Sequence, residues 1–339
     1  MDARPDGAGT AGGPVGSGTA GRVGVVLNPT SGKGRGRSIR DQVFDGLAAD
    51  GFQVYDLSGP DLPAATARAR TGLTLGLDAL VAVGGDGMVH AGVNVVAGTG
   101  VPLGVVAAGT GNDIARALHL PVHDVTASLG TIREALAARR DGHRGPDGEG
   151  VRMLDAVGVS RPGGVVEHWY LAVLSCGIDA AVNARANAMT WPRGSARYVR
   201  ALMNELRTFE PFGYRVTMDG EVWESAGTLV AVANTRLFGG GLKIAPDATP
   251  DDGLLDVVYA DGLTRAQVLA VFPRLYTGAH VDHPAMHVRR ARSVLIEPVP
   301  SLGAVPPQAF ADGEPLFSLP VQCDLHPRAV GVLARTLDR

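Results

Sequence analysis

The sequence predicts an α/β amino-terminal domain on a parallel sheet, followed by a mainly antiparallel β-sandwich domain. Two short apolar runs in the first half, 79–83 and 103–107, lack polar alternation, as expected of parallel strands that are covered on both faces. Each run ends in a glycine-rich turn that leads into a helical pattern. In the second half, short apolar runs separated by turn residues favour antiparallel strands.

The expected elements of the first half alternate between strand and helix. Residues 22–27 form the first strand, residues 39–48 repeat apolar side chains at helical spacing, and Gly51 ends this helix. Strands are expected further on at 53–57, 79–83 and 103–107, and helices at 64–70, 114–120 and 124–140. Such alternation predicts right-handed βαβ units and a parallel sheet.

The second half has a different pattern. Asp219 and Gly220 separate two apolar runs and are typical of a hairpin turn. Strands are expected at 152–160, 165–174, 214–218, 221–224, 227–233, 254–260 and 292–297, and helices at 195–209 and 264–276. A sandwich of these strands is the simplest arrangement.

Composition suggests where the domains begin and end. Residues 1–20 are rich in Gly, Ala, Thr and Pro and are expected to be a disordered tail. The segment 139–150 has no core residues, so we expect a first domain at 21–145 and a second at 146–320. The last segment, 321–339, is expected to pack back on the first domain.

Charge, cysteine content and hydropathy exclude several classes of protein. The net charge is −3, so nothing indicates a nucleic-acid partner or a polybasic membrane anchor. Cys176 and Cys323 are too few for a disulfide framework and have no zinc-site spacing, so buried thiols in a reducing cytoplasm are expected. No apolar run approaches the roughly 18 residues that span a bilayer.

Glycine-rich turns that carry carboxylates follow two of the expected strands. They consist of Gly84, Gly85, Asp86 and Gly87 in one case and Gly109, Thr110, Gly111, Asn112 and Asp113 in the other. Glycines at a strand exit let the backbone approach a ligand and leave amide groups to bind phosphate. An aspartate there would repel phosphate unless a metal ion lies between them. The two turns therefore predict a Mg-nucleotide site at the carboxyl ends of adjacent strands.

A third loop, NPTSGKGRG, follows the first strand from Asn28. It is not a Walker A sequence, because no glycine stands five residues before Gly32 and Lys33 is followed by glycine. Lys33, Arg35 and Arg37 are candidate phosphate contacts. The alternative is a basic, solvated turn at a helix start.

The three loops resemble, in their order and separations, the catalytic domain of the diacylglycerol kinase and sphingosine kinase family of lipid kinases. Their sequences are NPTSGKG, GGDG and GTGND. Two segments of the second half extend the resemblance to roughly residues 22–333. They are GGGLKIAPDATPDDGLLDVVY at 239–259 and FADGEPL at 310–316. The resemblance implies a first domain similar to NAD kinase and phosphofructokinase and a β-sandwich that receives the lipid. The active site would lie between them.

The resemblance also implies roles for the matching residues. Asp312 matches the general base that deprotonates the lipid hydroxyl, and Asp86 and Glu314 match the other catalytic acids. Nucleotide-binding residues would be Asn28, Pro29, Thr30, Ser31, Gly32 and Lys33 in the first loop, Gly84, Gly85, Asp86 and Gly87 in the second, and Thr110, Gly111, Asn112 and Asp113 in the third. Magnesium ligands would be Asp113 and Asp155 near the reaction, and Asp252 with the carbonyls of Thr249 and Leu254 at a structural site.

Simpler roles stay open for several of these residues. The alternative for Asp113 is the N-cap of the helix 114–120, and Asp312 and Asp252 occur in sequences that also form plain turns. The helix 195–209 has a face for core packing, with a lipid-access lid as the alternative. His90, His168, His280, His283 and His287 lack zinc-site spacing and are expected in solvated loops.

The chain departs from the family after GGDG. Where the family commonly has Thr and then Asn-Glu, this chain has Met88, Val89, His90 and Ala91. The hydroxyl expected at Met88 and the acid expected at Ala91 are missing, and each lost polar contact costs about 1 kcal/mol or more.

The leading hypothesis is a kinase that uses ATP and Mg²⁺ to convert diacylglycerol to phosphatidic acid. It would be cytoplasmic and peripherally associated with a membrane surface. The alternatives are a sphingoid-base or other lipid kinase, a silent lipid- or nucleotide-binding regulator, and a kinase with a soluble substrate. The sequence leaves a monomer and a homodimer open.

Overall fold

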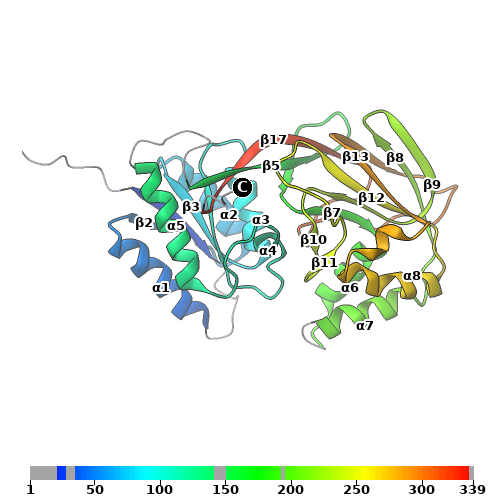
Figure 1. Cartoon of the computed structure of the whole chain (residues 1–339), viewed down its shortest axis with the longest axis horizontal. Helices are drawn as coiled ribbons and strands as arrows, with labels where there is room; N and C mark the ends of the chain where they lie inside the picture. Colours follow the sequence, from blue (N-terminus) through cyan, green and yellow to red (C-terminus); the bar gives the residue numbers. More distant parts are fainter. Residues whose placement is uncertain (1–20, 28–34, 141–149, 192–194, 336–339) are drawn as a thin grey trace, which may run out of the picture.

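The structure is a computed structural model and describes residues 21–27, 35–140, 150–191 and 195–335. Figure 1 shows a helix-covered lobe beside a β-rich lobe, with the long strands β5 (Val151–Ser160) and β17 (Val321–Leu333) running between them. The predicted fold class is confirmed: an α/β domain with parallel strands precedes an antiparallel β-sandwich domain.

The first domain is built on a parallel sheet. Its strands are β1 (Arg22–Leu27), β2 (Gln53–Asp56), β3 (Ala79–Gly84) and β4 (Leu103–Ala107), in the order β4-β3-β1-β2. The neighbours pair in parallel, and β17 adds a parallel pair at Val332 and Leu103. Every residue of β3 and β4 is buried, as predicted for strands covered on both faces.

Helices cover both faces of this sheet. The core between the sheet and α1 (Arg35–Ala49) and α5 (Val125–Arg140) includes Val43 and Leu129. On the other face, α2 (Leu62–Leu73) and α3 (Asp86–Val96) bury Ala65 and Val93. A short helix, α4 (Asp113–Ala117), follows β4. Both glycine-rich turns therefore emerge at the carboxyl edge of the sheet.

The second domain is an antiparallel sandwich centred on β9 (Glu221–Ala233). This strand pairs with three others, β7 (Val173–Gly177), β8 (Phe212–Met218) and β12 (Leu255–Asp261). The remaining strands are β6 (His168–Tyr170), β13 (Met286–Ala291), β14 (Ser293–Pro298), β15 (Phe310–Ala311) and β16 (Glu314–Pro315), with the separate hairpin β10 (Leu237–Phe238) and β11 (Leu242–Lys243). Cys176 and Cys323 are buried thiols in its core, as predicted.

Helices and 3₁₀ turns lie at one end of the sandwich domain. They are α6 (Ile178–Ala188), α7 (Ser195–Glu205), α8 (Arg265–Val271), η1 (Phe272–Tyr276) and η2 (Ala279–Asp282). The first three surround a small apolar cluster that includes Ile178, Leu202 and Val268. Thr264 begins α8 with a capping box to Gln267.

Several expected elements differ from those observed. The expected strand 165–174 is two strands, β6 and β7, because the chain turns at Leu171 and Ala172. The expected strands 221–224 and 227–233 form one strand, β9, and the expected helix 264–276 is divided into α8 and η1. Neither α6 nor β13 was predicted. The expectation of solvated histidines is wrong for His90 and His280, which are buried.

Candidate active site

The two glycine-rich loops of the first domain are in direct backbone contact. A Cβ atom on Gly109 would lie 2.3 Å from Cα of Gly85, and one on Gly85 would lie 3.1 Å from Cα of Gly109. Gly84, with φ 154°, accepts a hydrogen bond from the N–H of Ala108 at 2.9 Å. A side chain at Gly85 or Gly109 would fill this contact, so glycine is required here.

Asn112 shapes the second of these loops. Its φ is 56°, in the left-handed region that Asn tolerates better than most residues. Its Oδ1 accepts from the N–H of Gly109 and its Nδ2 donates to the carbonyl of Gly109, both at 2.9 Å. The side chain is thereby occupied within the loop, whereas Thr110 at the loop tip is exposed and open to a ligand.

Asp86, at the start of α3, faces the second loop. Its Oδ1 accepts a hydrogen bond from the N–H of Ile114 at 3.1 Å, and a Cβ atom on Gly111 would lie 2.9 Å from its Oδ2. Burial raises the pKa of Asp86 to about 6, with further contributions from the charges of Asp113 and Asp312. The structure therefore brings the two loop aspartates close enough to interact.

Asp113 connects the first domain to the second. Its Oδ2 accepts a hydrogen bond from the N–H of Gly240 at 2.6 Å, in the turn between β10 and β11. Its Oδ1 is buried and has no hydrogen-bond partner among the residues that the structure describes. Burial raises its pKa, partly offset by hydrogen bonds from Gly240 and Gly241. Such an oxygen is suited to a cation.

Asp312 occupies a tight turn between β15 and β16. Its φ is 51° and that of Gly313 is 86°, so the expectation of a hairpin turn holds. The side chain has 0% exposed surface, and its Oδ1 accepts from the N–H groups of Ala172 at 2.9 Å and Val173 at 3.2 Å. Its Oδ2 accepts from Leu171 N–H at 3.0 Å.

His90 supplies the fourth contact of Asp312. Its Nδ1 lies 3.2 Å from Oδ2 of Asp312, and its Nε2 lies 3.1 Å from Nδ2 of Asn94. The Asn94 amide is oriented by Trp169, whose N–H donates to Oδ1 at 2.8 Å and whose carbonyl accepts from Nδ2 at 2.7 Å. Nε2 must therefore accept, and the proton on Nδ1 is donated to Asp312.

His90 was missed as a site residue, although the sequence contained a signal. It stands four residues after Asp86 in the helical pattern that follows the first glycine-rich turn, and in α3 the two side chains share a helix face. Its neighbours along the chain are apolar, which is typical of a buried position. Met88 and Ala91, where the chain departs from the family, are also buried, and Met88 packs against Gly84.

Glu314 reaches the start of α3 from the second domain. A Cβ atom on Gly87 would lie 2.5 Å from Oε1 of Glu314, so this carboxylate lies over the glycine. The carbonyl of Gly313 accepts from Nδ2 of Asn183 on α6 at 3.3 Å. Asp86, Asp312 and Glu314, the three predicted catalytic acids, thus gather where the two domains meet.

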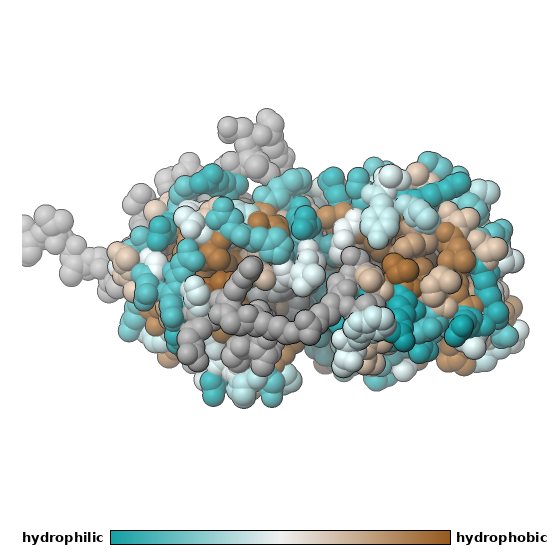
Figure 2. All heavy atoms as spheres, turned by 90° about the horizontal axis from the view of Figure 1, so that it is seen from below, coloured by the Kyte–Doolittle hydropathy of each residue, from teal (hydrophilic) through white to brown (hydrophobic). Residues whose placement is uncertain are grey.

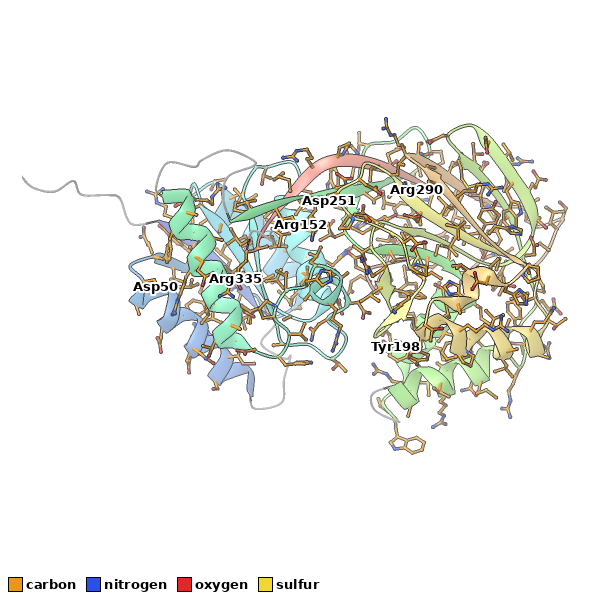
Figure 3. All side chains as sticks on the ribbon, viewed as in Figure 1. Asp50, Arg152, Tyr198, Asp251, Arg290 and Arg335 are labelled. Atoms are coloured by element: carbon orange, nitrogen blue, oxygen red, sulfur yellow. The ribbon has the colours of Figure 1, made fainter. Side chains whose placement is uncertain are left out.

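The other predicted metal ligands lie in a separate region. Asp155 accepts from the N–H groups of Arg328 and Gly253, each at 2.8 Å. Asp252 accepts from Leu254 N–H at 3.1 Å and forms an ion pair with Arg290, and the hydroxyl of Thr249 donates to the carbonyl of Asp247. Figure 3 shows Arg290 in this region, with the pair formed by Arg152 and Asp251.

Asp155 and Asp252 therefore hold the turn 250–254 against β17 and β13. Across the described ranges, no cluster of three or more His, Cys, Asp or Glu side chains has a geometry that could hold an ion. The predicted structural magnesium site stays a prediction. The first predicted nucleotide loop, from Asn28 to Lys33, lies outside the described residues.

The two glycine loops contact each other, and carboxylates converge beside them at the domain boundary. Together they define a phosphotransferase site. Phosphoryl transfer needs positioned phosphates, neutralised charge and a carboxylate near the acceptor hydroxyl.

Comparisons with known proteins identify the family. Residues 22–141 match the diacylglycerol kinase catalytic domain, and residues 172–334 match the YegS C-terminal NAD kinase beta sandwich-like domain. A diacylglycerol kinase of Mycobacterium tuberculosis is 34% identical over 92% of this chain and 95% of its own. A diacylglycerol kinase of Staphylococcus saprophyticus is 25% identical over 81% of this chain and 84% of its own. The crystal structure of a diacylglycerol kinase from Bacillus anthracis superposes on this chain with a TM-score of 0.65 and 19% sequence identity. The superposition covers 94% of this chain and 99% of that one.

The chain belongs to the diacylglycerol kinase family, and it is a lipid kinase. The resemblance inferred from five sequence segments is confirmed.

Proposed function

We propose that the chain transfers the γ-phosphoryl group of ATP to the free hydroxyl of diacylglycerol in a Mg²⁺-dependent reaction that gives phosphatidic acid. The names of the Mycobacterium tuberculosis and Staphylococcus saprophyticus relatives support this acceptor. The observation that carries the proposal is the convergence of Asp86, Asp113 and Asp312 beside the contact of Gly85 with Gly109.

The residues at the site suit a magnesium-bound phosphate chain. Gly85 and Gly109 hold the two loops together, and because they carry no side chains they leave the outer side of the loop backbone open to phosphate. Oδ1 of Asp113 is a buried acceptor without a partner in the described chain, and carboxylate oxygens are preferred Mg²⁺ ligands. When bound, Mg²⁺ would neutralise phosphate charge, and Asp86 and Asp113 would hold it.

In the proposed reaction, the acceptor oxygen forms a bond to the γ-phosphorus as the bond to the β–γ bridging oxygen breaks. ADP leaves, and the hydroxyl proton passes to a carboxylate. We assign Asp312 as this base from its match to the family. Its four contacts orient the carboxylate, and one of them must open for it to accept a proton.

Asp86 is a second carboxylate within the site. With a pKa of about 6, Asp86 is mostly ionised at neutral pH, as a magnesium ligand has to be. The two acids have different proposed roles. Asp86 holds the metal ion and the phosphates, and Asp312 receives the proton.

The reaction is proposed to take place at a membrane surface, because diacylglycerol resides in the bilayer. Of the helices in the described ranges, none has the length and apolar character needed to span a membrane. We propose that the chain reaches its substrate by peripheral, transient binding from the cytoplasm.

The test is transfer of labelled phosphate from ATP with Mg²⁺ to diacylglycerol in mixed micelles, and to a total lipid extract. We expect labelled phosphatidic acid from the wild type and a loss of at least about 100-fold with Asp312→Asn. Asp219→Asn is the matched control, because Asp219 occupies the same type of Asp-Gly turn between β8 and β9, with φ 47°. It should keep near wild-type activity.

Other results would select the alternatives. A labelled sphingoid base from the extract, without labelled phosphatidic acid, would replace diacylglycerol as the substrate. The fully occupied Asp312 carboxylate favours one further candidate, a silent lipid- or nucleotide-binding regulator. ATP binding with no labelled lipid would support it.

A further inference from the structure

Helix α7 presents apolar side chains to solvent. Val199 is 48% exposed and Met203 is 49% exposed, although both are large and hydrophobic. Leu202 and Leu206, each three residues after one of these two, adjoin them on the helix and are buried in the cluster shared with α6 and α8. Core packing therefore accounts for Leu202 and Leu206, and it leaves the neighbouring Val199 and Met203 about half exposed to solvent.

Arginines accompany these exposed apolar residues. Arg200 lies beside Val199, and Arg207 follows in the turn after α7, one helical turn beyond Met203. Trp191, just before the helix, is 70% exposed, and the guanidinium of Arg200 lies 5.1 Å from its ring centroid. We call Trp191, Val199, Arg200, Met203 and Arg207 the α7 face.

The local charge has the opposite sign to that of the whole chain. Residues 180–210 contain five arginines and two glutamates, a formal charge of +3, whereas the chain carries −3. Glu205 is paired with Arg185, so it does not neutralise the α7 face. An apolar and aromatic surface with arginines is typical of a helix that lies in the headgroup region of a bilayer.

The pictures agree with this arrangement. Figure 1 shows α6, α7 and α8 together along the lower end of the β-rich lobe, and Figure 3 marks α7 by Tyr198. Figure 2 views the molecule from below and shows hydrophobic residues on the β-rich half, beside hydrophilic ones.

The α7 face is also linked to the candidate active site. Asn183 on α6 donates to the carbonyl of Gly313, between Asp312 and Glu314. On the same helix, Arg185 forms the ion pair with Glu205 that joins α6 to α7. A bilayer bound to α7 would thus lie against the helix pair that contacts the catalytic turn.

We propose that the α7 face docks on an anionic lipid bilayer and brings the second domain to its lipid substrate. The inference rests on the proposed function, because only a lipid acceptor requires contact with a bilayer. The partner is a membrane rather than a protein, because the face combines an interfacial tryptophan, exposed aliphatic side chains and two arginines that form no ion pair with the residues that the structure describes.

The test is co-sedimentation of the full chain with vesicles of phosphatidylglycerol and phosphatidylcholine, or of phosphatidylcholine alone. We expect the wild type to bind the anionic vesicles, with binding weakened by salt. Val199→Asp combined with Met203→Asp should reduce binding by at least about tenfold. Arg200→Glu combined with Arg207→Glu tests the contribution of the arginines and should reduce vesicle binding by about fivefold or more per arginine.

Val222→Asp on β9 is the matched control, because Val222 is 59% exposed and lies outside the α7 face. It should bind vesicles as the wild type does. Circular dichroism and thermal unfolding of each variant check that the chain is still folded. Equal binding by the wild type and both double variants would overturn the proposal, as would equal binding to neutral and anionic vesicles.

Kinase assays separate this inference from the proposed function. The α7 variants should phosphorylate a water-soluble, short-chain diacylglycerol as the wild type does and lose activity only on vesicle-embedded substrate. If the wild type phosphorylates no diacylglycerol yet binds anionic vesicles through α7, the proposed function fails and the docking surface stands. Normal activity of the variants on vesicle-embedded substrate would contradict the docking proposal alone.

Discussion

Nδ1 of His90 lies 3.2 Å from Oδ2 of Asp312, across the boundary between the two domains. The imidazole lies in the first domain, on the helix that follows the glycine loop of Asp86, and the carboxylate lies in the second. Asn94 and Trp169 fix the tautomer in which His90 donates to Asp312. The predicted base is thus oriented by a residue that the family resemblance did not assign.

Removing the His90 imidazole should weaken both the fold and the reaction. His90→Ala leaves Oδ2 of Asp312 with one fewer hydrogen-bond donor and opens a cavity between α3 and the second domain. A hydrogen bond to a charged group contributes about 1.5–3 kcal/mol, so we expect a loss of that order in the free energy of unfolding. Urea denaturation measures it, and kinase assays should show a lower kcat with a smaller change in the KM for ATP.

His168→Ala is the control for this substitution. His168 lies on β6 next to Trp169 and is partly exposed, and it does not contact Asp312. The variant should lose less stability than His90→Ala and keep its kcat. Equal effects of the two substitutions would show that the His90 contact with Asp312 has no special role.

The raised pKa of Asp86 predicts a particular dependence of stability on pH. Its pKa is raised from 3.8 to about 6 by burial first and then by the charge of Asp113. Between these two values the folded chain binds more protons than the unfolded chain, so the free energy of unfolding falls as pH rises. The stabilisation from a neutral Asp86 is complete below pH 3.8 and is lost as pH rises through about 6.

Asp86→Asn should remove this dependence. The amide keeps an oxygen for the N–H of Ile114 and carries no charge beside Asp113. At pH 7.5 we expect it to be about 1–3 kcal/mol more stable than the wild type, with phosphoryl transfer lost, and the difference in stability should shrink toward pH 4. Urea denaturation across this range is the measurement. A constant difference would mean that Asp86 titrates normally in the folded chain.

Local sequence patterns were sufficient to predict the sheet of the first domain. The runs that became β3 and β4 are continuously apolar because both faces are covered by helices, and periodicity detects such burial directly. The glycine turns after them could be placed for the same reason. The sequence alone therefore predicts that Asp86 and Asp113 are neighbours.

Contacts between the domains could not be predicted in this way. Two of these contacts join residues far apart in sequence: His90 contacts Asp312, and Asp113 contacts Gly240. No local sequence pattern contains such information. The role of Leu171 and Ala172 was hidden because their apolar side chains suggested a continuous strand, whereas their N–H groups turn toward Asp312. Helix α6 was missed because it begins directly after the apolar strand β7.

The contact of the two glycine loops should make Gly109→Ala severe. The new Cβ atom would lie 2.3 Å from Cα of Gly85, and backbone atoms cannot move aside cheaply. We expect a loss of at least about 2 kcal/mol in the free energy of unfolding, together with weaker ATP binding, measured by urea denaturation and calorimetry.

Gly130→Ala is the matched control for Gly109→Ala. Gly130 lies within α5, and a Cβ atom there meets nothing within 4 Å. Since alanine favours the helix, the substitution should stabilise the chain by about 0.5–1 kcal/mol and leave ATP binding unchanged. If both substitutions are neutral, the loops must be able to separate without cost.

Magnesium removal tests the structural site predicted at Asp252. In this structure Asp252 forms an ion pair with Arg290 and accepts from Leu254 N–H, so a bound ion would have to share its carboxylate with that arginine. If the site exists, Mg²⁺ raises the Tm of the wild type, and EDTA reverses the increase. We expect Asp252→Asn to abolish the part of this response that comes from the structural site.

Asp86→Asn distinguishes the two magnesium sites. It removes a carboxylate from the nucleotide site and leaves the turn 250–254 intact, so a Tm response to Mg²⁺ without ATP should persist in this variant. Nucleotide-dependent stabilisation should instead be lost in Asp86→Asn and kept in Asp252→Asn. If Asp252→Asn responds to Mg²⁺ as the wild type does, Arg290 serves as the counterion of Asp252 and the structural metal site is absent.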